Sequence, residues 1–129
     1  MSYYFTKTVN RSFEQAIADV TLALKEKGFG IITEIDVKQT FMDKLETEFR
    51  PYRILGACNP KFAYRVINME DKVGLMLPCN VIVQQHEDGR VEVSAIDPEA
   101  AMQPVNIKEM EKFACEAGNI LQGIISGLL

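Results

Sequence analysis

Two cysteines, Cys58 and Cys79, each lie where a strand-like run of apolar residues is interrupted by a proline. Each is followed directly by an asparagine, Asn59 and Asn80. A thiol beside such a break in the chain could bind a soft metal ion, take part in redox chemistry or contact a ligand. Because free cysteines are often buried simply as small apolar side chains, packing alone would also account for the pair.

The two thiols should differ in reactivity. Asn59-Pro60 is typical of a helix start, with Asn as the N-cap and Pro in the first turn. Cys58 would then directly precede a helix N-terminus, where free N–H groups and the helix dipole favour a thiolate. Cys79 lies in an apolar segment that should raise its pKa. We therefore expect Cys58 to be the more reactive thiol.

The chain direction of the two segments decides whether the two sulfur atoms meet. If the strands are parallel, both cysteines should lie toward the carboxyl ends of neighbouring strands. If the strands are antiparallel, the cysteines are expected at opposite ends of the sheet. The stretch between Cys58 and Val73 is long enough for either arrangement. A spacing of 21 residues between the cysteines matches no zinc-site pattern.

Other candidate residues have structural explanations. Asp97 follows a predicted strand and could join Glu34 and Asp36 in a carboxylate site, although helix capping is the simpler explanation of Asp36 and Asp97. His86, the single histidine, is next to a predicted hairpin turn, which rarely holds a catalytic base in a cleft. Cys115 lies beside the apolar stripe of the last helix. The sequence contains no nucleophile-elbow, Walker or dinucleotide-binding motif, so we favour a binding domain over an enzyme.

Composition indicates one globular domain over residues 1–129, with 47% apolar and 25% charged residues. The net charge of −4 makes nucleic acid a poor partner. The first residues do not form a signal peptide, and no apolar run reaches the roughly 20 residues of a membrane span. Three cysteines are an odd number, which is typical of free thiols in a reducing compartment. We therefore expect a cytoplasmic protein with no membrane partner.

Hydrophobic periodicity and cap signals predict an α+β fold of two layers, with helices on one face of a mainly antiparallel sheet. The expected order is β-α-β-α-β-α-β-β-α, with a long C-terminal helix packed across the sheet. The expected strands are residues 3–9, 29–35, 52–57, 73–85 (interrupted at the proline) and 90–96. The expected helices are residues 13–27, 37–49, 60–67 and 106–128, with a capped helical turn over 97–102.

The last helix carries glycines at unusual positions. Gly123 and Gly127 are one turn apart and, with Ile120, would form a smooth surface away from the main apolar stripe. Such a surface permits close approach of another helix, in the same chain or in the partner of a homodimer. Fraying of a terminal helix is the alternative explanation.

Three segments of the sequence carry a pattern that is typical of a known family. They are Tyr-Arg-Ile-Leu-Gly-Ala-Cys-Asn-Pro (52–60), Gly-Leu-Met-Leu-Pro-Cys-Asn-Val-Ile-Val (74–83), and Ser94 to Pro98. The chain resembles the domain of unknown function 302 family over nearly its whole length. The resemblance implies a helix-grip or TATA-binding-protein-like α+β fold and a homodimer, and it implies no activity. Its antiparallel sheet weakens the case for adjacent sulfurs. The positions that carry the family pattern are Cys58, Asn59, Pro60, Pro78, Cys79 and Asp97.

The leading functional hypothesis is a non-enzymatic domain that binds a small molecule or a soft metal ion near the two cysteines. Cys58 and Cys79 would be the metal ligands, and the sequence identifies no cofactor. The alternatives are a thiol-dependent redox protein or enzyme, and a structural homodimer module without a ligand. The residues expected at the binding site are Cys58, Asn59, Cys79, Asn80 and Asp97.

Overall fold

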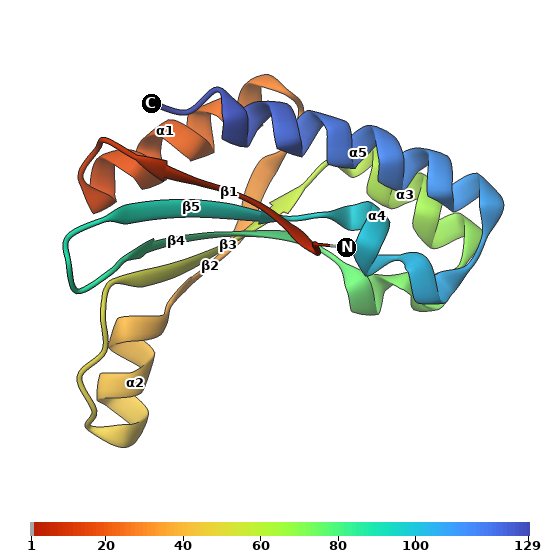
Figure 1. Cartoon of the computed structure of the whole chain (residues 1–129). Coiled ribbons are helices and arrows are strands. Elements are labelled where there is room, and N and C mark those ends of the chain that lie inside the picture. The colour runs from red at the N-terminus through yellow and green to blue at the C-terminus, as the bar shows by residue number, and fades with distance from the viewer. Residues whose placement is uncertain (1) are drawn as a thin grey trace.

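The computed structural model describes residues 2–129, in which five strands form one antiparallel sheet with the strand order β1-β5-β4-β3-β2. Helices α1 and α5 lie side by side on one face of the sheet, and α3 and α4 lie at one end of it (Figure 1). The α+β fold, the element order and the long C-terminal helix are as the sequence predicted. The strands are β1 (Tyr4–Val9), β2 (Gly30–Asp36), β3 (Tyr52–Cys58), β4 (Cys79–Gln85) and β5 (Val91–Ile96). The α-helices are α1 (Phe13–Glu26), α2 (Val37–Leu45), α3 (Pro60–Met69), α4 (Pro98–Ala101) and α5 (Lys108–Ser126), and the 3₁₀ turns are η1 (Asp71–Met76) and η2 (Gln103–Val105).

The predicted helix starts are held by side-chain caps. Ser12 Oγ accepts a hydrogen bond from the backbone N of Gln15 at 3.2 Å, and Asp36 Oδ1 accepts one from Gln39 N at 3.0 Å. These bonds satisfy N–H groups that have no partner within the helix. After α1, Gly28 adopts φ +86°, a left-handed conformation that ends the helix as predicted.

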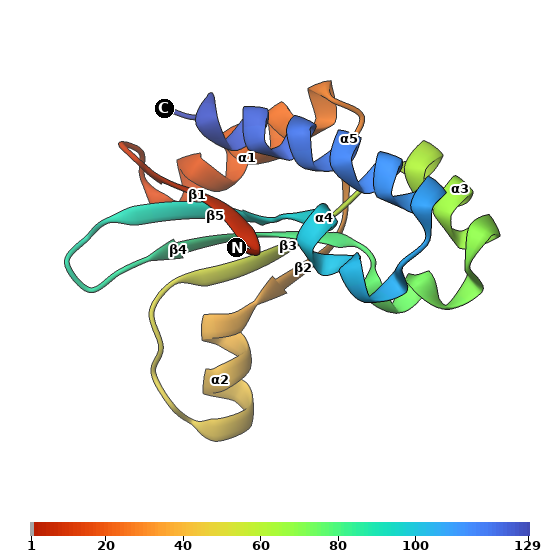
Figure 2. The same ribbon diagram turned by 45° about the vertical axis from the view of Figure 1, so that its right-hand side comes forward.

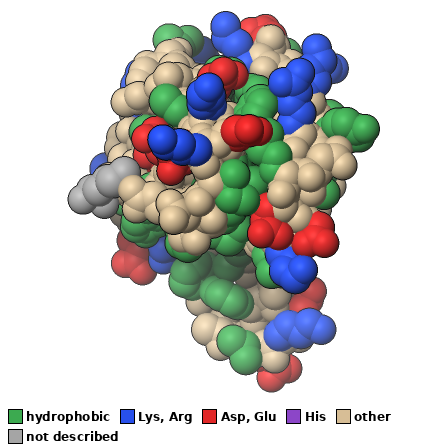
Figure 3. Space-filling model, turned by 90° about the vertical axis from the view of Figure 1, so that its right-hand side faces the viewer, with side chains coloured by type: hydrophobic (Ala, Val, Ile, Leu, Met, Phe, Trp, Pro, Cys, Tyr) green, Lys and Arg blue, Asp and Glu red, His purple; other side chains and the backbone are tan. Residues whose placement is uncertain are grey.

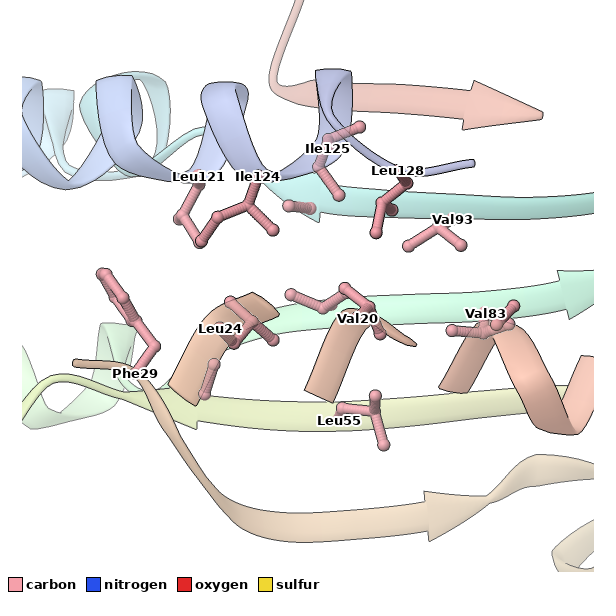
Figure 4. Packing of buried hydrophobic residues seen from close by; sticks show 14 of the residues in the cluster. Val20, Leu24, Phe29, Leu55, Val83, Val93, Leu121, Ile124, Ile125 and Leu128 are labelled. Carbon is pink, nitrogen blue, oxygen red and sulfur yellow. The ribbon is translucent and has the colours of Figure 1, made fainter. Parts of the chain in front are cut away.

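The main core lies between the sheet and the pair α1 and α5. Figure 4 shows side chains of α5 pointing toward those of α1 and toward the inner face of the sheet. A smaller cluster around Val66, Val73 and Met110 joins α3, η1 and α5 beyond the end of the sheet. The main cluster includes Val20, Leu24, Phe29, Leu55, Val83, Val93, Leu121, Ile124, Ile125 and Leu128.

Helix α2 departs from two predictions. The helix was expected to reach Phe49, but it ends at Leu45 because Glu46 takes a left-handed conformation with φ 51°. Phe49 instead turns back, and its ring lies 5.0 Å from that of Phe41. In addition, α2 does not join the helical layer, since it projects from the opposite side of the sheet (Figure 2).

Two further boundaries differ from the sequence expectations. The segment before Pro78 is not extended, because residues 71–76 form η1 and the strand begins only at Cys79. Asn106, expected as the cap of the last helix, has φ 53°, and α5 begins at Lys108. Across the described chain, no helix combines the length and the apolar character that crossing a bilayer requires.

Candidate thiol site

Cys58 and Cys79 are neighbours across two adjacent strands. Cys58 is the last residue of β3, Cys79 is the first residue of β4, and Ala57 pairs directly with Cys79 in the antiparallel register. The expectation that an antiparallel sheet would separate the two cysteines was therefore wrong. It assumed that Cys79 lay in the middle of a strand beginning at Val73, whereas η1 delays the strand and places Cys79 at its first position.

Both cysteines border a small cavity at this end of the sheet. Its volume is about 40 Å³, and its walls come from β3, β4, α3, α4 and α5. Three aromatic rings form much of the wall, with centroids of Phe29 and Phe62 6.4 Å apart and those of Phe62 and Phe113 5.9 Å apart. The cavity is therefore a largely apolar compartment in which two thiols and the Met102 side chain are the sulfur groups.

The two thiols have unequal environments. Burial raises the pKa of the Cys79 thiol from its ordinary value of 9.0 to about 11, with a smaller contribution from the negative charge that Cys58 would carry. Loss of the Cys79 proton is therefore unfavourable unless a cation replaces it. The raised pKa agrees with the expectation from the apolar sequence around Cys79.

Asn59 fixes the chain directly after Cys58. Its Oδ1 accepts hydrogen bonds from the backbone N of Lys61 at 3.1 Å and of Phe62 at 3.4 Å. Asn59 is thus the N-cap of α3, and Pro60 occupies the first turn, as predicted. On its other side, Asn59 lies so close to Gly28 that a β-carbon there would be 3.3 Å from Nδ2. The result is that Cys58 is held at the positive end of the α3 dipole.

Asp97 and Asn80 are not brought to the cavity wall. Asp97 Oδ1 accepts a hydrogen bond from Glu99 N at 3.0 Å and caps α4, and the next residue, Pro98, lines the cavity. Asn80 follows Cys79 in a strand, so its side chain points to the opposite face of the sheet, where it is exposed. Of the five predicted site residues, the structure thus places Cys58, Cys79 and Asn59 at the cavity.

Sequence reasoning missed Met102, Phe62 and Phe113 as wall residues. Phe62 was identified only as part of a helix, and Met102 only as the end of a helical turn. Nothing in the spacing connects them, because α3, α4 and α5 meet over the cavity through long-range packing. The one signal in the sequence was that Met102, which has a thioether side chain, lies close to the Asp97-Pro98 motif.

The remaining candidate groups lie elsewhere. His86 follows the far end of β4, and its Nε2 is 3.2 Å from Glu92 Oε1. Cys115 is exposed on α5. In residues 2–129, no group of three or more histidine, cysteine, aspartate or glutamate side chains is placed to hold a metal ion. A metal at the cavity would therefore depend on the two cysteines, with the Met102 thioether as the remaining soft donor.

Comparison with known proteins connects the whole chain to one family. Residues 5–128 match the family described as Domain of unknown function DUF302. The fold is similar to the crystal structure of an uncharacterized conserved protein DUF302 from Bacillus stearothermophilus, with 26% sequence identity and a TM-score of 0.90. That similarity covers 98% of each chain. No curated protein matches the sequence.

Proposed function

Because this chain belongs to the family Domain of unknown function DUF302, whose name records no activity, we propose a function from the cavity itself: the binding of one soft metal ion, Cu(I), between Cys58 and Cys79. The single observation that carries this proposal is that two unlinked cysteines from neighbouring strands border one small apolar cavity. Thiolate and thioether sulfur are the protein ligands that select Cu(I).

The size of the cavity favours an ion over an organic ligand. Pockets for drug-sized molecules have volumes of roughly 300–1,000 Å³. A cavity of about 40 Å³ has room for an ion or for a few atoms. Among small ligands, one that bonds directly to sulfur gains the most from a wall that offers few other polar groups.

The number of donors favours Cu(I) over Zn²⁺. Structural zinc sites use four ligands in a tetrahedral arrangement. This cavity offers the two cysteines as donors. Among the described residues, no histidine, further cysteine or carboxylate is placed to add a third donor for a metal ion. Cu(I) accepts two or three sulfur ligands, so Cys58 and Cys79 suffice and the thioether of Met102 can add a third.

The surroundings of the two cysteines also favour a pair of thiolates whose negative charge is balanced by a bound cation. A bound Cu(I) would replace the proton that burial holds on Cys79. The complex of one Cu(I) with two thiolates keeps one negative charge, and Cys58 precedes the N-terminus of α3, whose dipole favours negative charge. Asn59 has the supporting role of holding that helix end in place.

Competition between the reduced protein and a chromophoric Cu(I) chelator tests the proposal. We expect one Cu(I) per chain. We expect Cys58→Ser and Cys79→Ser each to lower the affinity by more than the roughly 10- to 100-fold that follows loss of an outer-shell partner. Cys115→Ser is the matched control and should bind as the wild type does. Met102→Leu conserves volume, so a loss of affinity there would assign the thioether as a third ligand.

A reversible dithiol is the second candidate, and the adjacency of the two free cysteines favours it. Oxidation would join the two Sγ atoms, release two protons and pass two electrons to an oxidant such as glutathione disulfide. After mild oxidation, the number of thiols titrated in denaturant would fall from three to one. If three thiols remain titratable, the redox role is wrong and the metal proposal is unaffected.

A further inference from the structure

A second hollow lies directly outside the thiol cavity, on the side of η1 and α4, and we call it the outer hollow. Its volume is about 250 Å³. Five residues line both the thiol cavity and the outer hollow and so form the partition between them: Leu77, Pro78, Cys79, Pro98 and Met102. Figure 3 looks onto this end of the molecule and shows hydrophobic side chains between the charged groups of its surface.

The sulfur side chains of this region follow one another from the surface inward. Met76, the last residue of η1, lines the outer hollow only, and 38% of its surface is exposed. Met102 and Cys79 lie in the partition, and neither is fully buried. Cys58 lines the thiol cavity only. The order Met76, then Met102 and Cys79, then Cys58 is therefore a continuous series of soft donors that ends at the proposed metal site.

The backbone that carries Met76 is fixed, although its side chain is exposed. Val73, in the same 3₁₀ turn, is 1% exposed in the small cluster beyond the end of the sheet. Leu77 N donates to Gly74 O at 3.2 Å directly after Met76. A methionine side chain is unbranched and has three rotatable bonds. The thioether of Met76 is thus free to turn between solvent and the outer hollow while its main chain stays in place.

The lining of the outer hollow discriminates between metal ions. Among the described residues that line it, none carries a charge, and Asn80 is the one polar residue. Ca²⁺ and Mg²⁺ are bound by oxygen ligands, and Zn²⁺ is bound by thiolate, imidazole or carboxylate groups. A neutral thioether attracts none of these ions strongly, whereas it is a preferred ligand of Cu(I).

A thioether also differs from a thiol in what binding requires. A cysteine has to lose its proton before it bonds to a metal ion, whereas a methionine has no proton to lose. The outermost sulfur of the series, Met76, is therefore suited to take up a cation directly from solvent or from a carrier. The thiols behind it are suited to hold that cation more tightly.

We propose that Cu(I) enters and leaves the thiol cavity through the outer hollow, with the thioether of Met76 as its first and transient ligand. This inference rests on the proposed function, because it assigns the route to the Cu(I) site of Cys58 and Cys79. On entry, a lone pair of the Met76 sulfur bonds to Cu(I) as one ligand of the carrier leaves. Cys79 Sγ then bonds to Cu(I) and gives its proton to water. The bond to Met76 breaks as Cys58 completes the site, and copper remains Cu(I) throughout.

A transient ligand changes rates and leaves the equilibrium as it was. Because Met76 contacts Cu(I) only during passage, it lowers the barrier to loading and the barrier to release by the same amount. Loss of its sulfur should therefore slow both processes by the same factor, and the dissociation constant, which is their ratio, should not change. A permanent ligand, or a residue that only shapes the cavity, would change the dissociation constant.

Stopped-flow transfer of Cu(I) between bicinchoninate and the reduced Cys115→Ser protein tests the route. The decay of the coloured chelate measures loading at increasing protein concentration, and excess chelator added to the loaded protein measures release. Met76→Leu conserves volume and removes the sulfur. We expect both rate constants to fall by at least about threefold, with an unchanged dissociation constant. Met42→Leu is the matched control, because Met42 is 41% exposed on α2, does not line the outer hollow and should exchange as the parent protein does.

The outcomes separate this route from the binding site that it serves. Unchanged rate constants in Met76→Leu would overturn the route and leave Cu(I) binding intact. A weaker affinity in Met76→Leu would also overturn it, because Met76 would then be a permanent ligand. A parent protein that takes up no Cu(I) at equilibrium would overturn the proposed function, and the route with it.

Discussion

Gly118 of α5 lies against the carboxylate of Asp97, so close that a β-carbon at position 118 would be 3.3 Å from Asp97 Oδ1. Asp97 is held in turn by the backbone N of Glu99 and by its own N–H, which donates to Tyr3 O at 2.8 Å. This contact fixes how α4 packs against α5, and these two helices form one wall of the thiol cavity. The close approach explains a glycine that helix propensity alone disfavours.

Replacement of the α5 glycines by alanine should separate this contact from helix propensity. Gly123→Ala meets no atom within 4 Å and should raise the free energy of unfolding by up to about 1 kcal/mol. Gly118→Ala gains the same propensity but crowds Asp97, so it should be clearly less stable than Gly123→Ala. Denaturant unfolding measures the free energy of unfolding of both variants. An equal increase in the two would show that the contact with Asp97 does not affect stability.

Gly56 is a position where a side chain has no room. A β-carbon there would overlap Thr33 Oγ1 and come within 2.8 Å of Pro78 Cγ. Gly56→Ala should therefore lower the free energy of unfolding by about 1–3 kcal/mol. Gly30→Ala in β2 is the control, because nothing lies within 4 Å of its β-carbon. Adding Thr33→Ala to Gly56→Ala should recover part of the loss, and no recovery would contradict the steric explanation.

The cap of α3 is expected to contribute measurably to stability. Asn59→Ala removes the oxygen that accepts from Lys61 N and Phe62 N and should cost about 0.5–2 kcal/mol. Asn59→Asp keeps an accepting oxygen and should cost less. Asn80→Ala, at the exposed asparagine after the other cysteine, is the matched control and should leave the thermal midpoint nearly unchanged. Equal losses at both asparagines would argue against the cap.

The raised pKa of Cys79 predicts a pH-dependent reactivity. Only the thiolate reacts with iodoacetamide, so labelling of Cys79 should be slow near neutral pH and should rise about tenfold per pH unit toward pH 11. Peptide mapping should find Cys115 and Cys58 labelled first. Because the folded state holds the Cys79 proton more tightly than the unfolded state, its contribution to stability is complete below about pH 9 and is lost between pH 9 and 11. Rapid labelling of Cys79 at pH 7 would contradict its burial.

Much of the fold is encoded in local patterns that the sequence displays. Ser12, Asp36 and Asn59 are caps in the structure as predicted, and the apolar stripes of α1 and α5 are the faces that form the core. These signals succeed because capping and amphipathic periodicity act within a few residues.

The failures arise where tertiary packing overrides the local pattern. Residues 73–77 are mostly apolar and resemble a strand, yet Val73 is buried in the small cluster with Val66 and Met110, and the segment coils into a 3₁₀ turn. That one change moved Cys79 from mid-strand to the first strand position and so brought it beside Cys58. Met102 could not be predicted as a wall residue either, because its proximity to the cavity depends on how α4 and α5 pack.

Binding of Cu(I) between Cys58 and Cys79 can be tested by identifying the atoms that surround the bound copper. X-ray absorption of Cu(I)-loaded Cys115→Ser protein should show one copper per chain with only sulfur neighbours, two from Cys58 and Cys79 and at most one more from Met102. Cys58→Ser in the same background should lose this all-sulfur signature. Copper with nitrogen or oxygen neighbours in the parent protein, or no retained copper, would rule out a Cu(I) site formed by Cys58 and Cys79.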